Sequence, residues 1–146
     1  MAGVIGTAMM TLSEVVEAKV TGRDPSTVPG QVGASLIGRA DDDATIGRLN
    51  TPVHWAHGIS MGVVRAAIGS TSLSPTSATL AHFASVWAGD ALLYRSLEIA
   101  PWPTEWPPRE LATDLFHKGV YAAVTGATFE YLVSSPSDAA RDRSAA

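Results

Sequence analysis

The side chains of this chain that are best suited to chemistry are single ionisable or hydrogen-bonding groups set in apolar stretches. They are Glu14, His54, His57, Arg65, Asp90, Asp114, His117 and Tyr121. At the helical step of about 100° per residue, the groups within each stretch fall on one side of a helix. Ionisable residues inside apolar helices are a sign of a functional site. The sequence therefore predicts a polar seam inside a helical bundle.

Four helices position these groups, and proline and glycine residues mark their ends. We expect helices over 2–20, 52–69, 77–99 and 108–133, with one long connection over 30–48. The halves 2–69 and 77–133 resemble each other, since each has a helix, a Pro-Ser/Thr-x-x-Pro loop and a helix that opens near a histidine. The sequence predicts an all-α domain over residues 1–133, built from two tandem helical hairpins, and a polar tail over 134–146.

Glycines decide the environment that we expect for these helices. Gly58, Gly62, Gly119 and Gly126 lie on the polar sides of their helices. Glycine inside a helix costs ~1 kcal/mol relative to alanine, but it lets two helices approach closely, as they do in lipid. The helices also contain few of the Glu, Lys and Gln residues that are typical of water-facing helices. We therefore expect a four-transmembrane-helix bundle, with polar and small residues inside and apolar residues toward lipid.

The expected location is the inner (plasma) membrane, which the protein crosses several times. Arg and Lys residues lie mainly in or near the two loops that follow the first and third helices, and positive charge favours the cytoplasmic side. These two loops are therefore expected in the cytoplasm. The alternative is a cytoplasmic four-helix bundle that dimerises through its glycine-rich sides.

Two spacings within the seam favour a metal or haem site. Glu14 and Glu17, like His54 and His57, are three positions apart, which places both members of each pair on one helix face. Carboxylates and imidazoles from different helices of a bundle can bind a metal, and His117 could complete the ligand set. Metal or haem binding at Glu14, His57 and His117 is therefore one hypothesis.

Two other interpretations of the seam stay open. Glu14, His57 and His117 could pass a proton or line a path for a small solute, since histidine titrates near neutral pH. Alternatively, the seam is structural, and pairs such as Asp114 with Lys118 or Glu14 with His57 satisfy one another. The chain contains no Ser-His-Asp order, phosphate loop or nucleotide fingerprint. We therefore favour an accessory component of a larger membrane assembly, with no cofactor and no catalytic activity.

Composition restricts the partners of this protein. The net charge is −4, and the ten Lys and Arg residues are scattered, so the chain lacks the basic patch that nucleic-acid binding requires. Cysteine is absent, which excludes disulfides and thiolate metal sites. The expected partners are membrane lipid and either other membrane subunits or further copies of the chain.

The most distinctive segments of the chain are Gly6–Thr11 with Glu14, Thr21–Ser26, His54–Gly58, Trp102–Leu111 and His117–Tyr121. Together they resemble a family of small, uncharacterised multi-pass membrane proteins of bacteria, mainly actinobacteria, over most of residues 3–132. The resemblance implies a multi-pass topology and no particular activity. His57 stands where we expect an aromatic residue, and Lys118 where we expect a histidine or an apolar residue. A function that needs paired histidines at 117 and 118 is therefore not supported.

Overall fold

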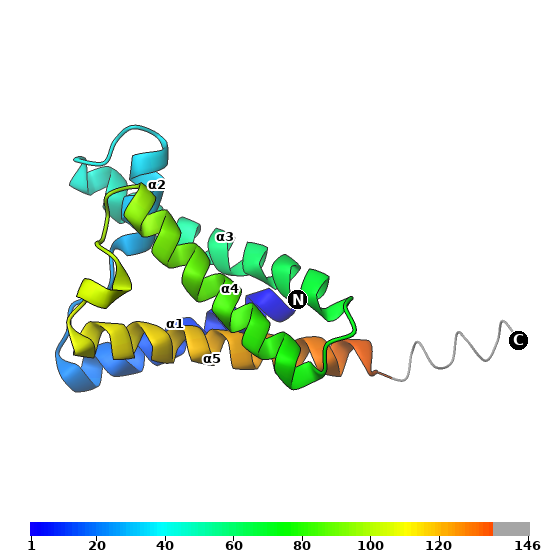
Figure 1. The fold of residues 1–146 in the computed structure, drawn as a ribbon. Coiled ribbons are helices and arrows are strands. Elements are labelled where there is room, and N and C mark those ends of the chain that lie inside the picture. Colours follow the sequence, from blue (N-terminus) through cyan, green and yellow to red (C-terminus); the bar gives the residue numbers. More distant parts are fainter. Residues whose placement is uncertain (136–146) are drawn as a thin grey trace, which may run out of the picture.

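A computed structural model describes residues 1–135 of the chain, which are helical and contain no strand (Figure 1). Five α-helices and one short 3₁₀ helix make up this part of the chain. Their bounds are α1 Ala2–Thr21, α2 Val28–Leu36, α3 Asp43–Gly69, α4 Pro75–Ser96, η1 Pro103–Glu105 and α5 Pro108–Val133. The tail that the sequence predicts over 134–146 lies almost entirely outside the described residues.

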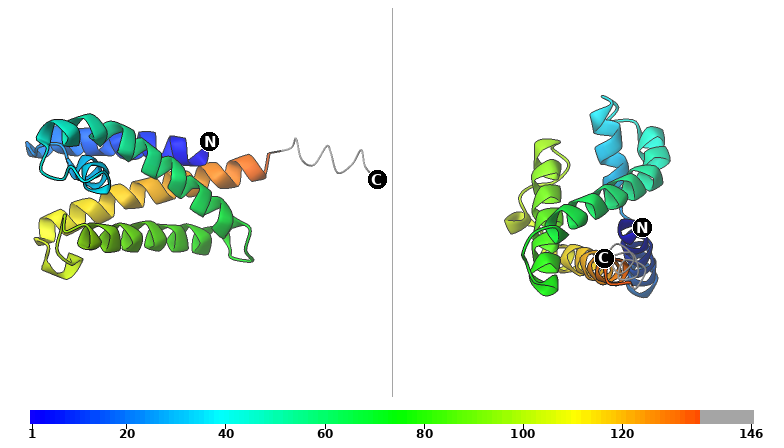
Figure 2. Two further views of the ribbon diagram at one scale, coloured as in Figure 1. Left: turned by 90° about the horizontal axis from the view of Figure 1, so that it is seen from above. Right: turned by 90° about the vertical axis from the view of Figure 1, so that its right-hand side faces the viewer.

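The four long helices form two layers. Helices α1 and α5 run side by side in opposite directions, while α3 packs on α1 and α4 packs on α5 (Figures 1 and 2). The layers meet at the end where α3 turns into α4, and they diverge toward the other end (Figure 1). At the diverging end, α2 and the start of α3 lie on one side, and the start of α5 lies on the other. This divergence leaves room for a cavity between the layers.

Local sequence signals set several helix ends. The side chain of Asp42 accepts a hydrogen bond from Thr45 N at 3.1 Å, and that of Ser74 accepts one from Ser77 N at 3.3 Å. Such N-caps satisfy the free N–H groups of a first turn. Gly22 ends α1 in the left-handed region with φ of 69°, which glycine adopts without steric cost. These ends follow from the residues beside them.

The segment before residue 52 differs most from expectation. The sequence predicts a long connection over 30–48 and a helix that begins at Pro52, but the structure forms α2 in the connection and begins α3 at Asp43. Pro52 therefore lies inside α3. Helix α2 packs on the first turns of α3, where Gly30 N donates to Asn50 Oδ1 at 2.9 Å. Between the two long helices of the second half, α4 and α5, there is only the short helix η1, whereas the first half has α2 between α1 and α3. The two halves are therefore not equal hairpins.

The interior contains polar and charged side chains as well as apolar ones, and many large apolar side chains are exposed. Buried polar residues are Thr7, Arg65, His82, Asp90, His117, Lys118 and Thr125. Exposed apolar residues include Met9, Leu12, Val16, Val20 and Phe116. Buried charges are tolerated when they are paired and hydrogen-bonded, so this fold depends on ion pairs inside it.

Glycines allow the helices of this chain to approach one another. A Cβ atom added to Gly62 would lie 2.7 Å from Gly3 Cα, and Gly58 and Gly126 likewise leave no room for a side chain against α1 and α4. Gly119 has no such neighbour within 4 Å. Three of the four predicted packing glycines therefore lie at contacts within one chain. Gly58 and Gly62 already contact α1. They are therefore not available for the dimer interface of the alternative four-helix bundle, which would use these glycine-rich sides.

The predicted four-transmembrane-helix bundle is wrong, and so is the multi-pass, inner-membrane location. No helix within residues 1–135 combines the length and the apolar character that crossing a membrane requires. A crossing helix needs about 20 predominantly apolar residues, and charges interrupt the longest ones: α3 carries Arg48 and Arg65, and α5 carries Asp114 and Lys118. The glycine argument misleads because these glycines serve packing within the chain. The expected cytoplasmic placement of the loops loses its basis as well.

Candidate functional site

A cavity of about 320 Å³ lies at the diverging end of the bundle, and all five α-helices contribute to it. We call it the Glu14 cavity. Its polar lining includes Glu14, Arg23, His54, His57, Asp90, Tyr94, Asp114 and Lys118. Its apolar lining includes Val15, Ala18, Val28, Pro29, Val32 and Trp55. An apolar pocket with a few convergent polar groups is typical of small-molecule sites.

Lys118 is the centre of the polar lining. Its Nζ lies 2.5 Å from Asp114 Oδ1 and 3.2 Å from Asp90 Oδ2. His57 Nε2 lies 3.0 Å from Asp90 Oδ1, although the ring is not aligned for a hydrogen bond to it. Burial favours the neutral acid, but the contacts with His57 and Lys118 outweigh it and hold the pKa of Asp90 below its usual range. Two carboxylates therefore share one ammonium group.

Glu14 has no such partner. None of residues 1–135 makes a hydrogen bond to its carboxyl group. Burial raises the pKa of Glu14 from 4.5 to about 7, and the positive charges of Arg23 and Lys118 oppose this effect only in part. Desolvation disfavours the charged form of an acid. Glu14 is therefore about half protonated at neutral pH, where a carboxyl group can both give and accept a proton.

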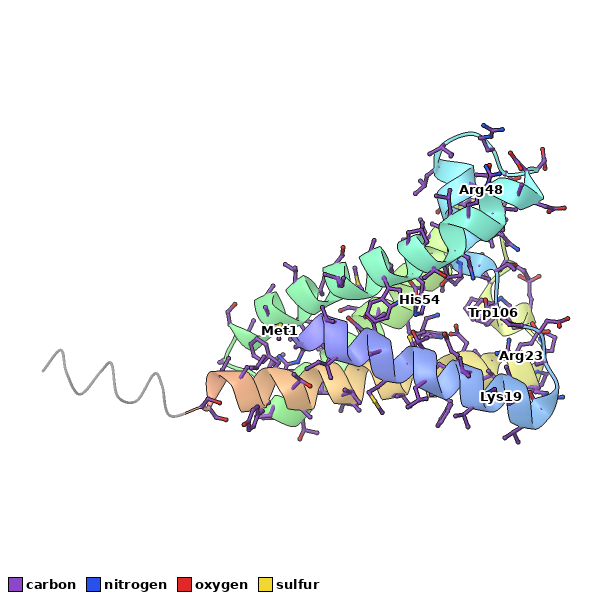
Figure 3. All side chains as sticks on the ribbon, turned by 180° about the vertical axis from the view of Figure 1, so that it is seen from behind. Met1, Lys19, Arg23, Arg48, His54 and Trp106 are labelled. Atoms are coloured by element: carbon purple, nitrogen blue, oxygen red, sulfur yellow. The ribbon has the colours of Figure 1, made fainter. Side chains whose placement is uncertain are left out.

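Two further groups of the lining, His54 and Tyr94, are neutral. His54 lies between α3 and α1 (Figure 3), and its Nε2 is 3.0 Å from Thr11 Oγ1. Burial lowers the pKa of His54, so its imidazole is uncharged at pH 7. Burial and the charge of Asp90 raise the pKa of Tyr94, which keeps its hydroxyl protonated. The predicted Glu14–His57 pair does not form, because His57 contacts Asp90 instead.

Two of the predicted site residues lie outside this cavity. Arg65 is fully buried, with Nη2 at 2.6 Å from Glu130 Oε1 and its guanidinium 4.5 Å from the centre of the Phe129 ring. Tyr121 donates a hydrogen bond to Gly58 O at 2.6 Å, and burial raises its pKa to about 12. Arg65 links α3 to α5 through its ion pair with Glu130, although its Nε and Nη1 have no hydrogen-bond partner within residues 1–135. Tyr121 links α5 to α3 through its hydrogen bond to Gly58. We assign them a structural role.

His117 also lies outside the cavity, between α1 and α5, with two residues that resemble the members of a hydrolase triad. Ser13 Oγ is 2.8 Å from His117 Nδ1, and His117 Nε2 is 3.9 Å from Glu17 Oε2. Ser13 Oγ donates its proton to Met10 O at 2.7 Å, so His117 Nδ1 is the donor to Ser13. A nucleophilic serine must instead donate to its base. The group is therefore a contact between two helices and not a catalytic triad.

The three metal candidates do not form a ligand set. Glu14 and His57 both line the cavity, whereas His117 faces Ser13. Glu17, the predicted partner of Glu14, forms an ion pair with Arg23 at 2.8 Å. Within residues 1–135, no three His, Cys, Asp or Glu side chains are grouped so that they could hold a metal ion. The geometry therefore gives the metal or haem hypothesis no support.

Tyr94 is missing from the predicted seam, and Lys118 is predicted only as the partner of Asp114. The structure forms the Asp114–Lys118 pair and adds the contact of Lys118 with Asp90. Tyr94 follows Asp90 by four positions, and residues four apart lie on one face of a helix, so the spacing alone would have placed Tyr94 beside this acid. Lys118 matters most, because it supplies the positive charge that the two carboxylates share.

Comparisons of the chain with protein-family models, with curated proteins and with solved structures find no match. The resemblance to a family of bacterial membrane proteins stays a prediction, and the helices of residues 1–135 do not have the multi-pass character that it implies. The function is therefore argued from the Glu14 cavity itself.

Proposed function

We propose that this protein binds a small, partly apolar molecule in the Glu14 cavity, and that Glu14 exchanges a proton as the molecule enters and leaves. One observation carries this proposal: Glu14 is an acid without a hydrogen-bond partner among residues 1–135, and it borders a cavity of about 320 Å³. Small-molecule sites commonly have volumes of ~300–1,000 Å³. A half-buried acid without a hydrogen-bond partner beside such a space is poised to meet a ligand.

The chemistry of the lining supports a ligand with one apolar and one polar end. Helices α1 and α2 contribute aliphatic side chains such as Val15 and Val32, which favour contact with an apolar group. On the polar side, Asp90 and Lys118 are held by each other within the bundle. Groups that are fixed before a ligand arrives lose little freedom on binding. The cavity is therefore organised to orient a molecule and not only to enclose it.

A panel of three compounds of similar shape tests this function: phenethylamine, phenethyl alcohol and phenylacetate. Binding is measured by saturation-transfer NMR on the wild-type protein and two variants. Ala18→Phe fills the cavity, whereas Ala56→Phe adds the same side chain at an exposed position of α3 outside it. We expect at least one compound to bind the wild type and Ala56→Phe but not Ala18→Phe. If no compound binds, or if Ala18→Phe still binds, the proposal is rejected.

A second candidate function is self-association, since further copies of the chain are one of the partners that the sequence predicts. An apolar groove on the α1–α5 face is lined mainly by Met9, Leu12, Val16, Val20, Phe116 and Val120. Glu17, at this groove, is already paired with Arg23, so two copies can meet here without like-charge repulsion. Exposed apolar surfaces of this kind mark interaction sites, and a two-fold axis brings one such face onto its copy.

Light scattering after gel filtration tests self-association. Leu12 lies in the groove, and Leu92 is a similarly exposed leucine of α4 outside it. We expect a dimer for the wild type and for Leu92→Lys, and a monomer for Leu12→Lys, because only the first lysine would be buried at the interface. A monomeric wild type rejects this candidate without affecting the ligand-binding proposal.

A further inference from the structure

Three carboxyl groups line the Glu14 cavity, but only two side chains that are always positively charged, Lys118 and Arg23. Asp90 and Asp114 share the single charge of Lys118, which leaves an excess of one negative charge. Glu14 adds a second when it ionises. Arg23 reaches the cavity as well, but its guanidinium is bound to Glu17. The lining therefore repels an anion and favours a cation.

Two acceptors of the same lining have no hydrogen-bond partner within residues 1–135. Asp114 Oδ2 is buried and has no hydrogen-bond partner within residues 1–135. The carboxyl group of Glu14 is also without one. The ammonium group of Lys118 is committed to Asp90 and to the other oxygen of Asp114. Unpaired buried acceptors are costly, and a ligand that donates hydrogen bonds would remove this cost.

We infer that the ligand of this cavity is a protonated primary amine with an apolar arm, whose ammonium group binds between Glu14 and Asp114. This inference rests on the proposed function and names its ligand class. An ammonium group offers three donors and one positive charge, which matches the free acceptors and the excess charge. Trp55 and Tyr94 also line the cavity, and aromatic rings attract cations. The apolar arm lies against the aliphatic side chains of α1 and α2.

Binding of an ammonium group stabilises the ionised form of Glu14 and releases its proton. Other groups around the cavity also contribute to the electrostatic field at Glu14. They are Arg23 after α1, His54 and His57 on α3, Asp90 and Tyr94 on α4, and Asp114 and Lys118 on α5. Because Glu14 has a pKa of about 7, about half a proton is released per amine bound at pH 7. The amine is expected to bind about tenfold more weakly at pH 6 than at pH 8.

Isothermal titration calorimetry with phenethylamine, in two buffers of different ionisation enthalpy, measures both affinity and proton release. Phenethyl alcohol and phenylacetate are the uncharged and anionic controls. At pH 8 we expect the amine to bind at least about tenfold more tightly than either control, because charge interacts strongly in a partly buried site. In Glu14→Gln the amine should bind about tenfold more weakly and release no proton. Asp41→Asn removes an exposed acid outside the cavity and should leave both quantities unchanged.

The outcomes separate the ligand class from the proposed function. If the alcohol or phenylacetate binds as tightly as the amine and Ala18→Phe removes this binding, the amine class is wrong and the binding function stands. If none of the three compounds binds, both are wrong. If the amine binds without proton release and with equal affinity to wild type and Glu14→Gln, the placement of its ammonium group at Glu14 is overturned.

Discussion

Burial of Glu14 makes the fold less stable as the pH rises. The pKa of Glu14 is about 7 in the folded protein, against 4.5 for an exposed glutamate. The unfolded chain therefore loses this proton at lower pH than the folded protein, and each pH unit between the two values favours unfolding by ~1.4 kcal/mol. The contribution of neutral Glu14 to the free energy of unfolding is fully present below about pH 4.5, and it is lost as the pH rises through 7. The total loss is about 3 kcal/mol at most, since Glu14 keeps some contact with solvent.

The variant Glu14→Gln tests this reasoning, because glutamine has nearly the same shape and stays neutral at every pH. Urea unfolding of wild type and variant at pH 5 and pH 8 gives the free energy of unfolding of each. We expect similar values at pH 5 and a variant that is more stable by up to about 3 kcal/mol at pH 8. Other titrating groups cancel in the difference between the two proteins. An equal difference at both pH values would refute the burial of an unpaired acid.

Three further predictions concern packing and buried polar contacts. Gly62→Ala should lower the free energy of unfolding by ~2 kcal/mol, because the added Cβ would meet the α1 backbone. Gly119→Ala should raise the free energy of unfolding by ~0.5–1 kcal/mol, because the space around Gly119 is open. Urea unfolding of both variants tests whether the two changes have opposite signs. Tyr121→Phe removes a hydrogen bond to an α3 carbonyl and should cost ~1 kcal/mol in thermal unfolding. Glu130→Gln deprives buried Arg65 of its charged partner and should lower the free energy of unfolding by ~1–2 kcal/mol. This loss is smaller than for a fully buried pair, because Glu130 is partly exposed. An unchanged unfolding midpoint would contradict this prediction.

The sequence predicts the long helices well where their ends have local signals. The last helix begins and ends where we expect it, at Pro108 and Val133, because proline fits a first turn. The start of α3 is missed, since Asn50-Thr-Pro52 resembles a helix start while the true cap is Asp42. The missed helix α2 contains proline and glycine, so its local propensity is low. Its conformation comes from packing on α3, which a single sequence does not reveal.

The candidate site is predicted in part, for a geometric reason. Helical periodicity tells which residues share a face, and it brings together Glu14, His54, His57, Asp90 and Asp114. It does not tell how far along the bundle each residue lies, so Arg65 and Tyr121 are grouped with them although they lie outside the cavity. His117 and Lys118 are neighbours in sequence, yet one faces Ser13 and the other faces Asp90. A rotation of about 100° per residue separates such neighbours.

The pairing of the first helix with the last has a consequence for synthesis of the chain. Ser13 and His117, which join α1 to α5, are 104 positions apart, and Lys118 lies on the same late helix. Until α5 leaves the ribosome, Asp90 has no lysine beside it, and the side of α1 that α5 covers in the folded protein is exposed. Contacts between distant parts of a chain form slowly, and unfinished domains expose apolar surface. The nascent chain therefore cannot complete this interior from α1–α4 alone, and truncation before residue 118 should yield a protein that depends on chaperones.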